Sequence, residues 1–179
     1  MTLDPIISIA GALALAVILA SAALHKLQAP AWFERQLDAY QLLPTSLTTV
    51  TARALPVLEG ALALGLLFQP SRVTSAVLAA GLLALYALAM ITNLLRGRHD
   101  LDCGCAGPNS QQPLHPLLLI RNGLLIALAI PAGLPVAERT LGLFDGFVVL
   151  AAGAATLLIY AATDALLANR PRLLALTGR

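Results

Sequence analysis

Charged side chains are scarce in this 179-residue chain, where they make up 11% of the residues, against roughly 25% in typical soluble domains. The net charge is only +2 and is spread along the chain, so the sequence offers no basic patch for nucleic acid. Hydrophobic residues make up 59% of the chain, and the mean hydropathy is +0.84. This composition excludes an ordinary soluble domain and a nucleic-acid-binding protein, and it predicts an integral membrane protein.

Long polar segments are also absent. The longest polar connections cover 27–45 and 96–113, which leaves no room for a soluble domain. Between them lie apolar runs that each approach the ~20 residues needed to cross a bilayer. Because these runs are continuous rather than alternating, they favour helices over a β-barrel. The sequence therefore predicts an all-α, polytopic membrane helical bundle, one integral membrane domain over 1–179, with spans at about 6–24, 46–68, 73–95, 114–134 and 143–167.

The first apolar run resembles a secretory signal only in its position. No basic residue precedes the run and no clear cleavage site follows it, so we predict a retained helix. After it, Trp32, Phe33, Leu37 and Tyr40 recur at roughly helical spacing among charged residues. This pattern predicts a short helix that lies along the membrane interface.

The chain has only two cysteines, Cys103 and Cys105, and a single residue separates them in the most polar stretch of the sequence. A disulfide between them would close a small strained ring, and strain makes a disulfide easier to reduce. Such a bond suits thiol exchange better than structural stabilisation. Two alternatives remain open, namely two unrelated free cysteines in a loop and a metal site.

The metal alternative rests on two histidines that flank the cysteines. Two thiolates and two imidazoles form a legitimate tetrahedral zinc set, and thiolates also attract copper(I). Structural zinc sites, however, usually separate their cysteines by two to four residues. The sequence therefore predicts no metal, with His99, Cys103, Cys105 and His115 as the alternative ligand set.

Glu59 lies near the middle of the second predicted span. A carboxylate there costs at least ~2.5 kcal/mol unless it is paired or protonated, so Glu59 has either a functional role or an interhelical partner. The candidate partners are Lys26, Arg53 and Arg121. Arg121 has a second candidate role, because a cation close to the cysteine loop favours the reactive thiolate.

Basic residues concentrate on one side of the predicted topology. With five spans, the first and third loops and the carboxyl terminus share a side that carries seven lysines and arginines, against two on the other side. By the positive-inside rule, the cysteine loop 96–113 would face the cytoplasm. The seven are Lys26, Arg35, Arg96, Arg98, Arg170, Arg172 and Arg179, and the two are Arg72 and Arg139.

Six short segments of the chain form a recognisable set, namely Lys26-Leu27, 40–44 (YQLLP), 55–59 (LPVLE), 93–97 (NLLRG), 102–107 (DCGCAG) and Arg121-Asn122. Together they resemble the MauE methylamine-utilisation membrane proteins, which belong to the wider DoxX-like group. The cysteine segment is the most specific of them, although the family usually shows Cys-Gly-Cys-Phe-Gly and this chain has Ala106 in place of the aromatic residue.

The resemblance implies a four-helix core plus one helix, in the plasma (inner) membrane of a bacterium. It also implies a role in maturing methylamine dehydrogenase, whose small subunit is disulfide-rich, together with a thioredoxin-like partner. In that role Cys103 and Cys105 form the redox pair of a thiol-disulfide oxidoreductase component, with Glu59 and Arg121 in support. No cofactor is demanded, but a quinone is a candidate electron acceptor if Glu59 and Arg121 face the same cavity.

The family role concerns enzymes matured outside the cytoplasm, which disagrees with the charge count. On the family resemblance we expect the cysteine loop at the outer face. Two other classes of function remain open. One is a non-enzymatic assembly subunit whose cysteines are incidental, and the other is a transport or metal-handling protein that uses Glu59 and the Cys/His set.

Overall fold

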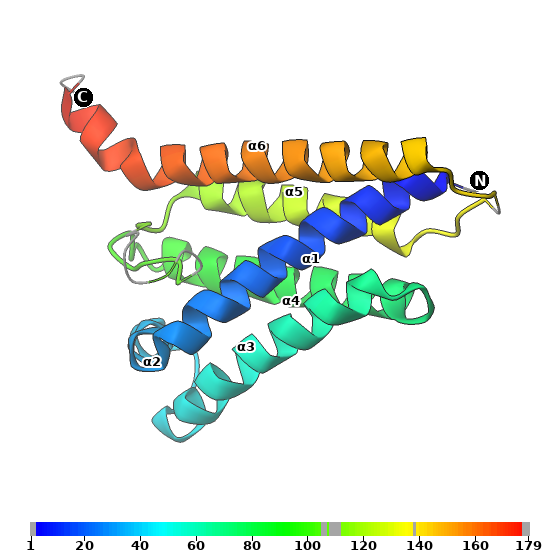
Figure 1. The fold of residues 1–179 in the computed structure, drawn as a ribbon. Helices are drawn as coiled ribbons and strands as arrows, with labels where there is room; N and C mark the ends of the chain where they lie inside the picture. The colour runs from blue at the N-terminus through cyan, green and yellow to red at the C-terminus, as the bar shows by residue number, and fades with distance from the viewer. Residues whose placement is uncertain (1–2, 105–106, 108–111, 138, 177–179) are drawn as a thin grey trace.

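The structure is a computed structural model, and it describes residues 3–104, 107, 112–137 and 139–176. Within these residues the chain folds into helices joined by short connections (Figure 1). This confirms the predicted all-α class. The helices are α1 (Pro5–Gln28), α2 (Pro30–Ala39), α3 (Thr45–Leu67), α4 (Gln69–Leu95), α5 (Pro116–Gly133) and α6 (Leu143–Leu176).

Prolines and short polar side chains set where the helices begin. Asp4 caps α1 by accepting a backbone hydrogen bond from the first turn, and Pro5 occupies the first helical position, where its missing N–H costs nothing. Helix α4 begins at Gln69, four residues before the predicted third span at 73, because Pro70 is tolerated in a first turn. Only Phe68 therefore separates α3 from α4.

Five of the described helices, α1, α3, α4, α5 and α6, are long and apolar enough to cross a membrane. This confirms the prediction of a multi-pass bundle with about five spans. The short helix predicted after the first span is α2, which has ten residues and buries Phe33 while it exposes Arg35. Its place at the membrane interface stays a prediction.

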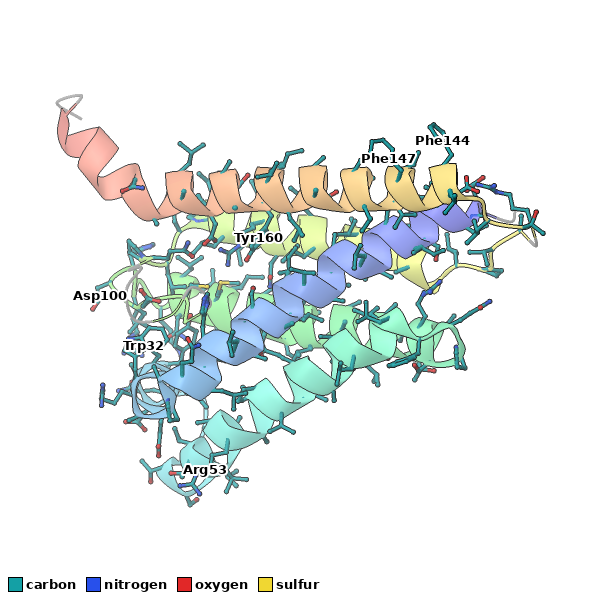
Figure 2. The ribbon with its side chains drawn as sticks, in the orientation of Figure 1. Trp32, Arg53, Asp100, Phe144, Phe147 and Tyr160 are labelled. Atoms are coloured by element: carbon teal, nitrogen blue, oxygen red, sulfur yellow. The ribbon has the colours of Figure 1, made fainter. Side chains whose placement is uncertain are left out.

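Four helices form the main core, and the fifth spanning helix packs on its outside. The largest buried cluster takes its fully buried side chains from α1, α3, α4 and α5, whereas α6 contributes only half-buried residues such as Leu157 and Tyr160. Phe144 and Phe147 of α6 point away from the bundle (Figure 2), as side chains that face lipid do. The expected four-helix core plus one helix is therefore present.

The connections gather at two ends of the bundle. Helix α2, the segment after α4 and the C-terminal end of α6 lie at one end, while the N-terminus and the connection from α5 to α6 lie at the other (Figure 1). At that other end the backbone of Leu3 pairs with Pro135 and Ala137, and Arg139 forms exposed ion pairs with Asp4 and Asp145. Which end faces the cytoplasm stays a prediction.

Candidate functional site

The segment that carries Cys103 is a closed loop between α4 and α5. The backbone N–H of Cys103 donates to the carbonyl of Gln112 at 3.0 Å, and that of Leu114 donates to the carbonyl of Leu101 at 2.9 Å. Leu101 and Leu114 are buried against α4 and α5. The two arms of the loop are therefore fixed side by side on the end of the bundle.

The carboxylate of Asp102 links the two arms of this loop through hydrogen bonds to the backbone. Its Oδ1 accepts the backbone N–H of Gly104 at 2.8 Å, and its Oδ2 accepts that of Gln112 at 2.7 Å. Burial raises the pKa of Asp102, while the two backbone hydrogen bonds act in the opposite direction. Gly104 has a φ of +74°, which glycine adopts without strain, and it lies against the ring of Phe33 in α2.

We expect Asp102→Asn to loosen the loop without unfolding the bundle. An amide side chain has one acceptor oxygen, so one of the two backbone N–H groups loses its partner, at about 1–3 kcal/mol. Amide hydrogen exchange over 101–114 should then accelerate by about five- to a hundredfold. Asp100→Asn, which changes an exposed carboxylate of the same loop, is the matched control, and unaltered exchange in Asp102→Asn would contradict the role of Asp102.

Arg121 of α5 lies beside Cys103 and is only 5% exposed. Its Nη2 donates to the Cys103 Sγ at 3.4 Å, and its Nη1 donates to the Gln112 Oε1 at 3.1 Å. Nη1 also forms an ion pair with Asp164 of α6, and the guanidinium lies 5.9 Å from the centre of the Tyr160 ring. The structure thus places Arg121 at the cysteine loop, as its position in the fourth span suggested.

Glu59 pairs with Lys26, one of its three candidate partners. The Lys26 Nζ lies 2.5 Å from the Glu59 Oε1, and the two side chains are 3% and 1% exposed. The Tyr86 hydroxyl donates to the same oxygen at 2.8 Å. Of the other candidates, Arg53 is exposed and points away from the bundle (Figure 2), and Arg121 pairs with Asp164.

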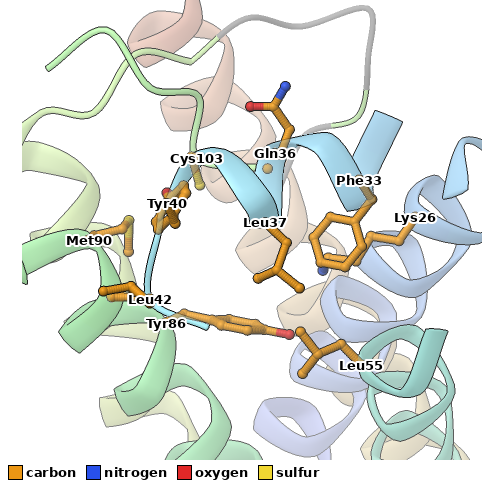
Figure 3. A pocket seen from close by; sticks show the side chains of 12 residues that line it. Lys26, Phe33, Gln36, Leu37, Tyr40, Leu42, Leu55, Tyr86, Met90 and Cys103 are labelled. Carbon is orange, nitrogen blue, oxygen red and sulfur yellow. The ribbon is translucent and has the colours of Figure 1, made fainter. Parts of the chain in front are cut away.

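A cavity of about 80 Å³ lies between α2, the cysteine loop and the neighbouring ends of α1, α3 and α4 (Figure 3). Neither Glu59 nor Arg121 lines it. Each lies behind a lining residue, because Glu59 contacts Lys26 and Tyr86, and Arg121 contacts Cys103. The lining residues are Lys26, Phe33, Gln36, Leu37, Tyr40, Leu42, Leu55, Tyr86, Ala89, Met90, Cys103 and Gly104.

The alternative metal set is not assembled by the residues whose positions the structure gives. Among them, no group of three or more histidine, cysteine or acidic side chains is placed to hold a metal ion. The His115 Nδ1 instead accepts the backbone N–H of Leu117 at 3.2 Å and caps α5, while His99 is exposed. Cys105 lies outside the described residues, so the pairing of the two cysteines stays a prediction.

Sequence reasoning missed three polar contributors to this region, namely Asp164, Gln112 and Tyr86. Asp164 carried a usable signal, because it is a carboxylate inside the predicted span 143–167 and the insertion cost that singled out Glu59 applies to it equally. Gln112 and Tyr86 carried no such signal in the sequence. A polar loop residue and a tyrosine in a span are ordinary until their neighbours are known.

Comparisons with known proteins point to one family. The sequence model described as "Methylamine utilisation protein MauE" matches residues 4–136. The methylamine utilization protein MauE of Paracoccus denitrificans is 43% identical over 148 residues, which cover 82% of this chain and 79% of the relative. That of Methylophilus methylotrophus is 32% identical over 166 residues, covering 92% and 87%, and that of Methylorubrum extorquens is 38% identical over 154 residues, covering 83% and 81%. No solved structure matches the chain.

Proposed function

The chain belongs to the MauE family of methylamine utilisation proteins, and from this premise we propose that it is a membrane thiol-disulfide component supporting maturation of a methylamine dehydrogenase-like enzyme. Its redox centre is the pair Cys103 and Cys105, and its direct partner is a thioredoxin-like protein. Family membership supports the pathway. The contact between the Arg121 guanidinium and the Cys103 sulfur carries the chemistry.

A buried cation beside a cysteine sulfur favours redox chemistry over a structural role. The guanidinium of Arg121 stabilises the negative thiolate, which is the form that attacks and leaves in thiol exchange. Asp164 and Gln112 hold the guanidinium in place from the other side, so it stays at the sulfur. The described part of the chain contains no free cysteine, which supports a Cys103–Cys105 disulfide.

The position of Arg121 supports different roles for the two sulfurs in this proposal. A thiolate of the partner attacks the sulfur of Cys105, the S–S bond breaks, and Cys103 leaves as the thiolate that Arg121 stabilises. A second partner thiolate then attacks the partner sulfur of this mixed disulfide and releases Cys105. The partner gains a disulfide, the Cys103–Cys105 pair becomes a dithiol after taking up two protons, and two electrons pass from the partner to this chain.

We expect the variant Cys103→Ser to accumulate a mixed disulfide between Cys105 and the thioredoxin-like partner in cells. In this variant the Cys105 thiolate attacks the disulfide of the oxidised partner, which is the reverse of the second step, and no Cys103 thiolate is present to displace the partner from the adduct. The adduct is read as a reducible mass increase on a non-reducing gel and identified by mass spectrometry. The double variant Cys103→Ser/Cys105→Ser is the matched control and should form no adduct.

Two results would contradict the proposal. If the double variant supports normal formation of the disulfides in the methylamine dehydrogenase small subunit, the cysteines are incidental and the chain acts as an assembly subunit. Labelling of intact cells with a membrane-impermeant maleimide tests the expected outer-face location. Labelling that appears only after reduction supports it, and labelling that requires an opened membrane contradicts it.

A further inference from the structure

A second cavity lies at the end of the bundle opposite the cysteine loop. The starts of α1 and α4 form part of its wall, and the connection from α5 to α6 forms the rest. These segments gather at one end of the molecule (Figure 1). The volume of the cavity is about 480 Å³, whereas one water molecule needs about 10–15 Å³. The cavity therefore admits a group as large as the headgroup of a lipid.

Polar and apolar side chains share the lining of this cavity. Arg72, Arg139 and Thr140 provide hydrogen-bond donors, and Ile9 and Leu141 provide aliphatic surface. Because two of the apolar helices begin here, the cavity lies where the hydrocarbon core of a membrane gives way to the headgroups. Donors beside aliphatic side chains at this depth match a phospholipid, in which a charged headgroup is joined to apolar chains.

Arg72 carries a charge that no described residue neutralises. Its Nε donates to the carbonyl of Leu66 at 3.3 Å, which holds the half-buried guanidinium against the end of α3. Its two Nη atoms donate to no residue that the structure describes, and Arg72 belongs to none of the ion pairs among those residues. A guanidinium presents paired N–H groups that match two oxygens of a phosphate. The Nη atoms of Arg72 therefore suit such a group.

Arg139 contributes a fixed position rather than net charge. Its Nη2 lies 3.0 Å from the Asp145 Oδ1, and its Nε lies 3.3 Å from the Asp4 Oδ2. These two carboxylates hold the guanidinium but are not among the residues that line the cavity. Within the described part of the chain, the lining thus contains no carboxylate that would repel a phosphate or pair with the ammonium of a zwitterionic lipid.

We propose that this cavity binds the phosphodiester of an anionic phospholipid such as phosphatidylglycerol. The Nη groups of Arg72 donate to the two non-bridging oxygens of the phosphate, and the Thr140 hydroxyl donates to a headgroup oxygen. Ile9 and Leu141 contact the first methylene groups of the acyl chains. A free phosphate ion has the same charged oxygens but no chains to cover the aliphatic wall. The site does not depend on the proposed function, because it lies at the far end of the bundle from Cys103.

The test uses the delipidated full-length protein in a neutral sugar-based detergent. Native mass spectrometry counts the molecules of short-chain phosphatidylglycerol that remain bound during a titration. We expect one molecule to bind well before any others, and we expect Arg72→Gln to weaken its binding at least tenfold, because the charge-assisted hydrogen bonds are lost. Arg53→Gln removes an exposed arginine from the first half of α3, and this variant should bind the lipid as the wild type does.

Thr140→Val provides a second variant that leaves the helices untouched. Thr140 is exposed in the connection from α5 to α6, and the substitution removes only its hydroxyl. We expect lipid binding to weaken at least threefold. Thermal unfolding of each lipid-free variant monitors the fold. A wild-type midpoint together with weakened binding assigns the loss to the site, and unaltered binding in both Arg72→Gln and Thr140→Val would overturn it.

Two comparisons identify the ligand. Phosphatidylcholine of the same chain length should bind at least threefold more weakly, because its ammonium stays unpaired. Equal binding of the two lipids that Arg72→Gln leaves intact would show an unspecific lipid shell and overturn the site, and equal binding that Arg72→Gln weakens would overturn the preference for an anionic lipid. Inorganic phosphate at millimolar concentration should not displace phosphatidylglycerol. Displacement would overturn the lipid as the ligand and assign the cavity to free phosphate.

Discussion

Replacement of Lys26 by methionine is expected to destabilise the bundle by about 3–5 kcal/mol. The Lys26–Glu59 pair is almost fully buried, and removal of one partner leaves the other as an uncompensated charge inside the protein. Methionine fills a similar volume, so the loss of stability results from removal of the charge rather than from an empty space in the core. Tyr86 donates to the same carboxylate but carries no charge, and it cannot replace the ammonium.

The measurement is reversible unfolding of the detergent-solubilised protein, followed by circular dichroism. The double variant Lys26→Met/Glu59→Gln removes both charges and should recover most of the lost stability, as neutral replacements of buried pairs often do. Arg53→Met makes a similar change at an exposed basic residue of α3 and should alter stability by less than about 0.5 kcal/mol. Equal stability of Lys26→Met and the wild type would mean that Glu59 is protonated and that no ion pair exists.

Replacement of Arg121 by glutamine is expected to slow thiol exchange at Cys103 by about ten- to a hundredfold. A hydrogen bond to a charged group contributes about 1.5–3 kcal/mol, and Arg121 supplies such a bond to the Cys103 sulfur. Loss of that bond lowers the thiolate population and makes Cys103 a poorer leaving group. The rate is measured with reduced thioredoxin as the attacking thiol at fixed pH.

The same substitution also deprives Asp164 of its partner, so stability and reactivity need to be separated. The double variant Arg121→Gln/Asp164→Asn removes the carboxylate charge as well, and we expect it to regain stability while exchange stays slow. Arg96→Gln, an exposed arginine at the same end of the bundle, should leave both quantities unaltered. If the double variant recovers the wild-type rate, Arg121 acts on the fold rather than on the sulfur.

The bundle could be predicted from the sequence because its main signal is local. A continuous apolar run of about twenty residues has few stable forms other than a spanning helix, and each of the predicted runs coincides with one long helix to within a few residues. The signal for the short amphipathic helix after the first span was equally local, because the apolar Phe33 and the charged Arg35 mark its two faces in the sequence. The start of α4 was placed too late, because Pro70 reads as a turn signal although it also fits a first helical turn.

The ion pairs could not be predicted, because they depend on how the helices cross. Arg53 shares a helix with Glu59 but is not three or four positions away, so the two cannot pair along one face. Lys26 meets Glu59 only because the end of α1 crosses the middle of α3 beside α2. The spacing of residues in the sequence does not reveal the angle at which two helices cross. The same reason hid the pairing of Asp164 with Arg121, which belongs to a different helix.

Asp164 lies on α6, the last helix to be synthesised, and this position has a consequence for how the protein is made. Ribosomes release a chain from its N-terminus, so Arg121 of α5 can enter the membrane before Asp164 of α6 does. During that interval an arginine lies in apolar surroundings with no carboxylate to neutralise it, a state that membranes tolerate poorly. Insertion of the last helix ends this state, because it supplies the carboxylate of Asp164. A chain truncated before α6 would keep both cysteines and still leave Arg121 without the carboxylate that pairs with it.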